Sequence, residues 1–373
     1  MPKYPGGDAV SMPGEIYLED VGRILETERP WDVLSGRRIL VTGATGMLGS
    51  IVTDALEAVS TKYRFDVTAM SRNPADLERM FFRHSDNPRF SVRAHDVNEP
   101  MMDADYDTII HLASNTHPRL YQSDPIGTIT TNVLGLKNLL DTVSHSEGGR
   151  FVFASSVEIY GQDRGDVERF DEGYCGYIDC NTLRAGYNES KRVGEALCQA
   201  YGHQFGTEFV IPRLSRLYGP SMRVGDSKAL SQFLTKAAAG EDIVLKSKGD
   251  QLFSYCYAAD AAEAVIHLLL NGRSGEAYNV SGPEDSDITL RELAEKLADI
   301  ASTKVVFEIP EAAEAAGYSK ASRALLDTSK IRATGWSPRY GIEEGLRRTV
   351  RALASERRRD LGRSRRGRGP PES

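Results

Sequence analysis

A tyrosine and a lysine stand four residues apart in the segment Tyr187-Asn-Glu-Ser-Lys191. On a helix this spacing places both side chains on one face. An ammonium group beside a phenol lowers the pKa of the phenol, so Tyr187 is a candidate general base for a substrate hydroxyl. Ser156 follows a predicted strand about 30 residues upstream, and a serine at the carboxyl end of such a strand lies beside the cofactor crevice. The three residues are therefore candidates for one catalytic site.

Glycines recur at Gly43, Gly46 and Gly49, directly after the apolar run 38–41 and at the start of a predicted helix that opens with Met47 and Leu48. Glycine lets a backbone approach a pyrophosphate closely, and a helix N-terminus offers free N–H groups and partial positive charge. A tight turn would also use glycine for steric reasons alone. The strand before the glycines and the helix after them favour dinucleotide binding.

The second predicted strand, 66–70, ends in Ser71 and Arg72 rather than in the acidic residue that usually holds the ribose of NAD. A hydroxyl and a guanidinium suit a 2′-phosphate, which favours NADP over NAD, although an exposed loop arginine would look the same. Asp96 follows the third predicted strand and is either a contact to the adenine amino group or a turn former.

Short β runs alternate with helical patterns along the first 220 residues, which predicts an α/β fold with a Rossmann-like, doubly wound parallel sheet. The pattern loosens after residue 220 and predicts a smaller C-terminal α/β lobe that binds substrate. The expected division is an N-terminal extension with one short helix (1–36), a dinucleotide-binding domain with the catalytic residues (37–220), the substrate lobe (221–352) and a disordered, Arg-rich tail (353–373).

The composition is that of a globular protein, with 46 Lys and Arg against 53 Asp and Glu in 373 residues. Residues 355–373 contribute +4 of the net charge of −7, so the remainder carries about −11 and nucleic acid is not an expected partner. The longest apolar run, 264–270, is too short for a membrane span. The four cysteines show no metal-ligand spacing, which predicts free thiols, no metal site and a cytoplasmic protein.

Several motifs together resemble the extended short-chain dehydrogenase/reductase family, the NAD(P)-dependent epimerases, dehydratases and decarboxylases of nucleotide sugars. The resemblance covers roughly residues 37–350 and rests on VTGATGMLG (41–49), HLAS (111–114), FASSVEIYG (153–161), GYNESKRVGEAL (186–197) and PRLSRLYGP (212–220). It implies that Tyr187 deprotonates a sugar hydroxyl, that Ser156 hydrogen-bonds the same oxygen, and that Lys191 binds the nicotinamide ribose and lowers the pKa of Tyr187.

The resemblance also implies that the cofactor, NAD or NADP, is retained through the catalytic cycle. The further cofactor contacts that it implies are Val97, Leu112, Ala113 and Ser114. Relatives commonly form homodimers through two helices of each subunit, and the predicted helices 132–143 and 187–201 are the ones expected to serve here.

Members of this family pass through a transient 4-keto sugar, from which epimerisation, dehydration or decarboxylation can follow. Dehydratases of the family have a motif similar to Thr-Asp-Glu where this chain has Ser156-Val157-Glu158. Valine cannot donate a proton to a leaving hydroxyl, which disfavours dehydration. The leading expectation is therefore a nucleotide-sugar epimerase that acts at C4. The alternatives are a nucleotide-uronic acid decarboxylase or a 4,6-dehydratase that uses Glu158 as a catalytic residue, then an NADPH-dependent ketoreductase or a non-catalytic NAD(P)-binding partner.

Two departures from the family pattern concern the nucleotide-sugar substrate. The chain has Arg216 where the family commonly has Asn, and Phe253 where the family commonly presents an Arg to the diphosphate. One arginine is gained and one is lost, so Arg216 is expected to take over anion binding, because a guanidinium holds phosphate or carboxylate through two hydrogen bonds. Arg323, Lys228 and Thr116 complete the expected substrate contacts.

Overall fold

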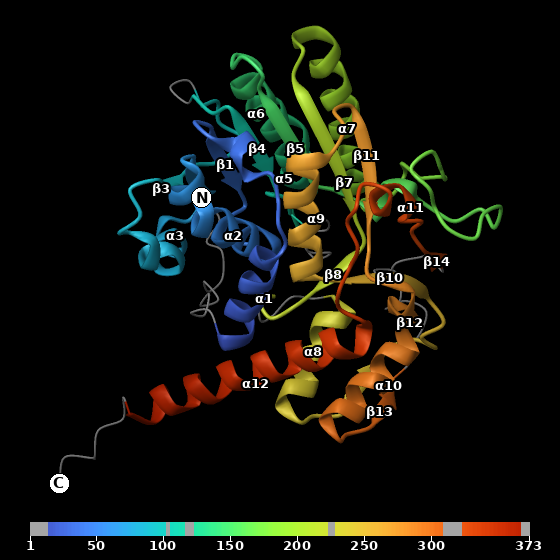
Figure 1. Cartoon of the computed structure of the whole chain (residues 1–373). Coiled ribbons are helices and arrows are strands. Elements are labelled where there is room, and N and C mark those ends of the chain that lie inside the picture. Colours follow the sequence, from blue (N-terminus) through green and yellow to red (C-terminus); the bar gives the residue numbers. More distant parts are fainter. Residues whose placement is uncertain (1–13, 102–104, 116–122, 223–227, 309–322, 367–373) are drawn as a thin grey trace.

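The computed structural model describes residues 14–101, 105–115, 123–222, 228–308 and 323–366 (Figure 1). Its centre is an eight-stranded sheet in the order β11-β7-β5-β4-β1-β2-β3, with the short β6 beside β7, and every strand pair in it is parallel. The predicted Rossmann-like fold is confirmed. The strands are β1 (Arg38–Thr42), β2 (Asp66–Ser71), β3 (Phe90–Ala94), β4 (Thr108–His111), β5 (Arg150–Phe153), β6 (Ser155–Ser156), β7 (Glu208–Leu214) and β11 (Glu276–Val280).

Helices cover both faces of this sheet. One apolar cluster joins one face to α1 (Glu15–Glu26), α2 (Met47–Tyr63), α3 (Pro74–Phe81) and α9 (Ala258–Asn271). A second joins the other face to α6 (Leu136–Ser144) and α7 (Ala185–Phe205). Within β1, Ile39 and Val41 belong to the first cluster and Leu40 to the second. A strand buried on both faces has to be apolar at successive positions, which explains the run at 38–41.

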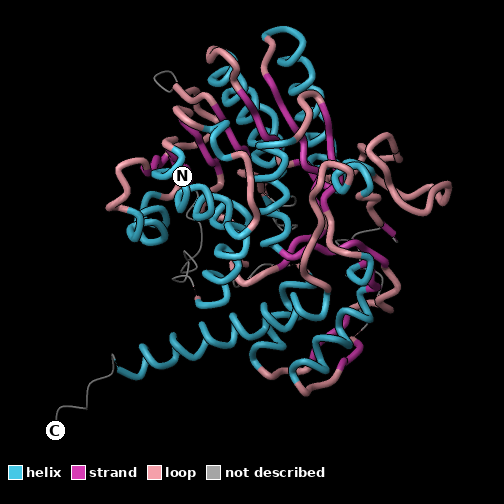
Figure 2. Tube along the Cα trace, in the orientation of Figure 1, coloured by secondary structure: helices cyan, strands magenta, loops and turns pink. Residues whose placement is uncertain are grey.

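The C-terminal lobe lies below the sheet in Figures 1 and 2. A small sheet formed by β8 (Arg216–Tyr218), β10 (Leu252–Tyr257), β12 (Asp287–Thr289) and β14 (Arg323–Ala324) supports it. The remaining elements of the lobe are α8 (Ala229–Ala239), β9 (Ile243–Leu245), α10 (Leu290–Ala301), β13 (Val305–Phe307) and α12 (Ile342–Arg366). Helix α11 (Ser329–Arg332) lies instead against β11, and its Ile331 belongs to the core of the main sheet. Short α5 (Pro125–Thr130), the π-helical turn η3 (Thr131–Gly135) and the 3₁₀ turns η1 (Trp31–Leu34), η2 (Phe82–His84), η4 (Val157–Tyr160) and η5 (Glu284–Ser286) connect the others.

The structure differs from the expected domain boundaries in two places. The chain returns from the lobe to the main sheet, because α9 and β11 carry apolar side chains that complete its core. Residues 353–366, expected to begin a disordered tail, continue helix α12. The first turns of that helix pack into the core of the lobe through the buried side chains of Leu346, Val350 and Leu353, and the helix continues from there through residue 366.

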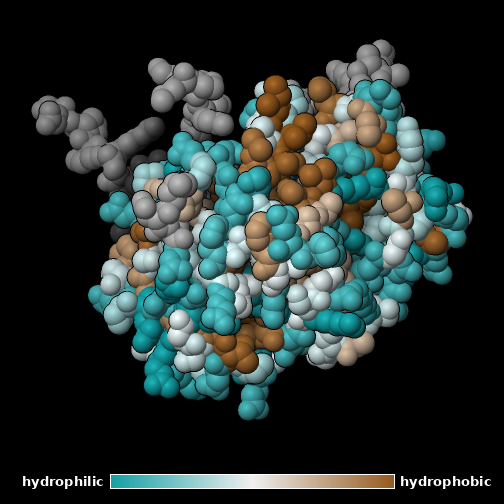
Figure 3. Space-filling model, turned by 90° about the horizontal axis from the view of Figure 1, so that it is seen from above, coloured by the Kyte–Doolittle hydropathy of each residue, from teal (hydrophilic) through white to brown (hydrophobic). Residues whose placement is uncertain are grey.

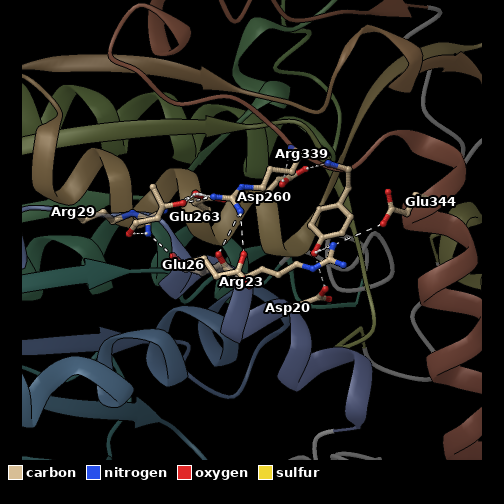
Figure 4. A network of polar contacts seen from close by, with 11 residues as sticks. Asp20, Arg23, Glu26, Arg29, Asp260, Glu263, Arg339 and Glu344 are labelled. Carbon is tan, nitrogen blue, oxygen red and sulfur yellow. Dashed lines mark hydrogen bonds and ion pairs between the residues drawn. The ribbon is translucent and has the colours of Figure 1, made fainter.

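The N-terminal extension contributes α1, which packs against α2, α9 and α12. Asp20 of α1 is fully buried and accepts hydrogen bonds from Tyr257 (2.6 Å), Tyr340 (3.1 Å) and Arg348 (2.7 Å). Figure 4 shows the neighbouring part of this network, in which Arg29 and Arg339 both reach Glu263 of α9. The extension therefore fastens the dinucleotide-binding domain to the lobe.

No helix in the described part of the chain is both long and apolar enough to cross a membrane. All four cysteines are free thiols, as expected, with Cys198 and Cys256 buried and Cys175 and Cys180 exposed.

Candidate active site

The glycine turn between β1 and α2 forms a close backbone approach. Gly43 has φ of +66°, and a Cβ on it would lie 2.7 Å from the backbone nitrogen of Ala113. A Cβ on Gly49 would lie 2.1 Å from the carbonyl oxygen of Gly43. Gly46 precedes Met47 at the start of α2, and no side chain among the described residues caps this helix. The tight turn leaves the N–H groups at Met47 and Leu48 available to a pyrophosphate.

The next part of the crevice follows β4, the strand on the far side of β1 from β2. The direction of strand connection reverses between β1 and β4, and such switch points open a crevice at the carboxyl ends of the strands. Leu112 and Ala113 leave β4 there, each with its N–H bonded to Thr42. The residues at this switch point therefore fit a dinucleotide, which when bound supplies a hydride acceptor.

The residues expected around the adenosine lie at the ends of β2 and β3. The hydroxyl of Ser71 is 3.0 Å from that of Thr45, and Arg72 is exposed. Asp96 accepts hydrogen bonds from the backbone and side chain of Asn98, both at 3.0 Å, which is the turn-forming role that the sequence left open. Val97 is buried against Gly135.

The structure brings the three expected catalytic residues together. Ser156 ends β6 and accepts the N–H of Glu158 at 3.2 Å, which fixes its side chain at the start of η4. The Tyr187 hydroxyl is hydrogen-bonded to Ser156. Lys191, one turn further along α7, donates to the carbonyl oxygen of Ala154 at 2.7 Å. The serine and the tyrosine can therefore hold one substrate oxygen between them.

The structure does not show the expected lowering of the Tyr187 pKa by Lys191. Burial raises the pKa of Tyr187 to about 12, with the Ser156 hydrogen bond and the charge of Arg184 opposing the rise. Burial also lowers the pKa of Lys191 to about 7, because the charged ammonium is poorly solvated beside the Phe153 ring. The prediction considered only the pairwise attraction, whereas desolvation is the larger effect on both groups.

A buried asparagine, which the sequence analysis did not select, connects the crevice to the catalytic helix. Asn132 lies in the π-helical turn η3, accepts from Ser114 at 2.8 Å and donates to Ser190 at 2.9 Å. Ser190 in turn donates to the carbonyl oxygen of Tyr187 at 2.9 Å. No sequence signal distinguished Asn132, because the segment 132–143 contains other polar residues such as Asn138 and Thr142, and only the fold shows which of them is buried.

Glu158 lies beside the catalytic serine and is held by arginines from two elements. Arg184, at the start of α7, donates to one carboxylate oxygen at 3.2 Å, and Arg216 of β8 approaches the other at 3.4 Å. These two guanidinium groups and Lys228 outweigh the effect of burial and hold the pKa of Glu158 below its ordinary value. Arg184 was not selected from the sequence, although its position three residues before Tyr187 places it at the same helix end.

The other expected substrate residues divide between two places. Arg216 lies with its guanidinium carbon 3.8 Å from the centre of the Phe253 ring, so the gained arginine and the phenylalanine are in contact. Arg323 lies on β14 and donates to the carbonyl oxygen of Glu168 at 2.7 Å, and within the described residues it makes no hydrogen bond or ion pair with Glu158. Lys228 precedes α8, and Thr116 lies outside the described residues.

A parallel sheet with a glycine turn at its switch point, and a serine–tyrosine pair at the end of the neighbouring strand, define a dinucleotide-dependent enzyme of the Rossmann type. The chain belongs to the NAD dependent epimerase/dehydratase family, whose model matches residues 39–281. The expected family and the expected nicotinamide cofactor are thereby confirmed.

Known proteins similar to this chain include sugar-nucleotide enzymes of three kinds. UDP-glucuronic acid decarboxylase 6 of Arabidopsis thaliana is 32% identical over 313 residues, which are 84% of this chain and 87% of that protein. DesIV, a dTDP-glucose 4,6-dehydratase of Streptomyces venezuelae solved with NAD, matches with a TM-score of 0.72 and 26% identity over 86% of this chain and 98% of that one. UDP-glucuronic acid 4-epimerase of Bacillus cereus has a TM-score of 0.71 at 21% identity, over 85% and 99% of the two chains.

Proposed function

We propose that the chain is an NAD-dependent decarboxylase of a nucleotide-linked uronic acid, of the UDP-glucuronic acid decarboxylase type. The observation that carries this proposal is the cluster of Arg184, Arg216 and Lys228 around Glu158, immediately beside Ser156. The two guanidinium groups alone outnumber the one carboxylate that they contact, which leaves an excess of positive charge at the end of the crevice where the sugar reacts. A neutral hexose has no use for that excess, whereas a second carboxylate does.

Each residue of the site has a distinct role in the proposed reaction. Tyr187 and Ser156 hold the sugar hydroxyl that loses its proton, and Lys191, one turn further along α7, would hold the nicotinamide ribose. Once the sugar carbon carries a ketone, the carboxylate lies β to it. The bond to the carboxyl carbon then breaks, its electron pair enters the enolate and carbon dioxide leaves. A proton then adds to that carbon, and the ketone would regain the hydride that the bound dinucleotide had accepted, which gives the pentose. The arginines stabilise negative charge on both sides of this step, and Glu158 remains ionised because they hold its pKa low.

Curated relatives that are decarboxylases support this alternative better than the leading expectation of C4 epimerisation. Dehydration is disfavoured by the position of Val157, which is buried in the apolar cluster of the lobe and offers no proton to a leaving hydroxyl. Epimerisation remains the second candidate, because Ser156 and Tyr187 suffice for it and a structural neighbour is a 4-epimerase of a uronic acid.

The test is incubation of the purified protein with NAD and either UDP-glucuronate or UDP-glucose. We expect UDP-glucuronate to yield carbon dioxide and a UDP-pentose, detected by mass spectrometry of the nucleotide product. A product of unchanged mass with a new configuration would replace decarboxylation by epimerisation. Tyr187→Phe should reduce kcat by at least the roughly 10²- to 10⁴-fold that a general base contributes. NAD binding, measured by fluorescence, should be retained.

We also propose that two copies associate through the surface of α5 and α7, which pack against each other. Figure 3 shows apolar side chains gathered on one part of the surface among polar ones. Exposed apolar residues on these elements and the adjoining η3 are Ile126, Ile129, Leu134 and Val193. Light scattering should give the mass of a dimer, and Val193→Asp should reduce it to that of a monomer. A monomeric wild-type protein would overturn the proposal.

A further inference from the structure

Arg216 is fixed by an aromatic ring rather than by a strong ion pair. Its strand, β8, runs parallel to β10, with Arg216 opposite Tyr255 in the register. The guanidinium carbon lies 3.8 Å from the centroid of the Phe253 ring, and Phe253 is itself buried. A guanidinium stacked on a ring is held in one plane, while the edge that carries its N–H donors stays open to a planar partner.

Most of those donors are not used within the described structure. Among the described residues, the side chain makes one hydrogen bond, the long one of 3.4 Å from Nη2 to Glu158. Its Nε is buried and has no hydrogen-bond partner among the described residues. A buried unpaired N–H is costly, and a guanidinium with five donors is commonly bound through two of them at once. The side chain is therefore set to accept a further anion.

The position of Arg216 indicates which part of the substrate supplies that anion. Arg216 contacts Glu158, whose N–H bonds Ser156, and Ser156 bonds Tyr187. This chain of contacts ends at the reacting hydroxyl of the sugar, whereas the pyrophosphate of the cofactor belongs at the glycine turn. The nearest anion that a nucleotide uronate can offer here is the carboxylate on the sugar carbon next to the reacting one.

We propose that Arg216, held in plane by Phe253, binds the sugar carboxylate and selects a uronate over a neutral hexose. This inference rests on the proposed function for the class of substrate. Arg184 remains on the other oxygen of Glu158 and neutralises it, so that the substrate carboxylate meets a cation rather than a repelling charge. Phe253 acts as a positioning residue, because it contacts the guanidinium and not the substrate.

The experiment measures binding of UDP-glucuronate and UDP-glucose to the NAD-loaded protein by titration calorimetry. Arg216→Gln removes the charge and keeps a polar side chain. We expect it to weaken UDP-glucuronate binding by about 10- to 100-fold, the usual worth of a charge-assisted pair, and to leave UDP-glucose within about twofold. Arg291→Gln is the matched control, because Arg291 also lies over a ring, that of Phe307, but far along the lobe.

A second variant separates the role of the stack from that of the arginine alone. The double variant Arg216→Phe/Phe253→Arg keeps one ring and one guanidinium in contact. It should restore part of the preference for UDP-glucuronate that the single variant Arg216→Phe loses. Arg216→Lys keeps the charge but not the planar donors and should retain only part of the preference.

Three outcomes would overturn the inference. Equal weakening of both ligands in Arg216→Gln would place the arginine at the diphosphate, and no weakening of either would leave it as a partner of Glu158 only. A wild-type protein that binds both ligands equally would remove the selectivity itself. A wild-type protein that prefers UDP-glucuronate through Arg216 but releases no carbon dioxide would refute decarboxylation and support the inference, so the two failures are distinguishable.

Discussion

Arg213 of β7 and Glu195 of α7 are joined by two hydrogen bonds, from Nη2 at 2.6 Å and from Nε at 3.0 Å. The same carboxylate accepts the hydroxyl of Ser155 at 2.6 Å, next to the catalytic serine. Glu195 also follows Lys191 by one helical turn, and its charge raises the pKa of that lysine against the larger lowering by burial. One half-buried carboxylate thus supports both the serine strand and the protonation of the catalytic lysine.

Glu195→Gln should move the pH profile of the reaction. With the carboxylate charge removed, the pKa of Lys191 falls below about 7, and the loss of activity on the alkaline side then begins at lower pH. Each unit of that shift costs about tenfold in kcat at a pH above both values. The measurement is kcat against pH for both proteins.

The control for this variant is Glu189→Gln, which removes a carboxylate from the same helix. Among the described residues, Glu189 forms an ion pair with Arg192 and accepts from the thiol of exposed Cys180. Its profile should coincide with the wild-type one. A Glu195→Gln protein whose alkaline limb does not move would show that the carboxylate has a structural role only.

Asn132→Ala should lower both stability and kcat. The variant breaks the path from Ser114 through Asn132 and Ser190 to the backbone of Tyr187, and it leaves buried groups unpaired, at a cost of about 1–3 kcal/mol. Because the path ends at the catalytic tyrosine, we expect kcat to fall more than KM rises. Urea unfolding and steady-state kinetics measure the two effects.

Asn138→Ala is its counterpart, since Asn138 bonds the carbonyl oxygen of Val97 from the neighbouring helix α6 and not the catalytic helix. It should lose stability with an unchanged kcat. If the two variants lose kcat alike, the connection from Asn132 to Tyr187 is not what maintains turnover.

Two adjacent carboxylates of α1 bond the same nitrogen of Arg348 and should differ greatly in their contribution. Asp20 is 0% exposed and also accepts from Tyr257 and Tyr340, whereas the Glu19 side chain is 48% exposed. Asp20→Ala should cost about 3–5 kcal/mol in the free energy of unfolding, because it removes the buried carboxylate that Arg348, Tyr257 and Tyr340 share. Glu19→Ala should cost at most about 1 kcal/mol, as exposed pairs do. Chemical denaturation of the full chain compares them, and equal losses would contradict the fastening role of Asp20.

The parts of the site that depend on local sequence could be predicted. A glycine turn depends on one strand–helix unit and a tyrosine four residues before a lysine on one helix. The structure has the glycines at the start of α2 and Tyr187 and Lys191 one turn apart on α7. Asn132 and Glu195 take their roles from partners 18 to 58 residues away. Their spacing in the chain therefore carries no signal.

Effects that depend on burial could not be predicted from the sequence. Desolvation sets the pKa of Tyr187 and of Lys191, and its size follows from the packing of the whole crevice. In the same way, helix α9 had the pattern of a lobe helix but completes the core of the main sheet, because strand β11 follows it there. The sequence predicts that Arg216 takes over anion binding, but it does not predict the contact of Arg216 with the Phe253 ring.

His84 should make stability depend on pH. Its ring lies between two carboxylates of α2, with Nε2 at 2.9 Å from Asp54 and Nδ1 at 3.0 Å from Glu57. Burial alone would lower the pKa of His84, but the hydrogen bonds and charges of both carboxylates outweigh it and raise the pKa above 6.5. The raised value means that the folded state holds the proton more tightly than the unfolded one. The stabilisation is therefore complete below about pH 6.5 and is lost as pH rises through the folded pKa.

His84→Asn should reduce this dependence. We expect the melting temperature of the wild-type protein to exceed that of the variant by more at about pH 6 than at about pH 8.5, because the stabilisation decreases as the folded imidazole loses its proton. Thermal unfolding at both values measures the difference, and taking variant against wild type cancels the other titrating groups. His145→Asn, at an exposed histidine that bonds a carbonyl oxygen of its own helix, should show no such trend. A variant whose deficit is the same at both pH values would mean that His84 is neutral between its two carboxylates.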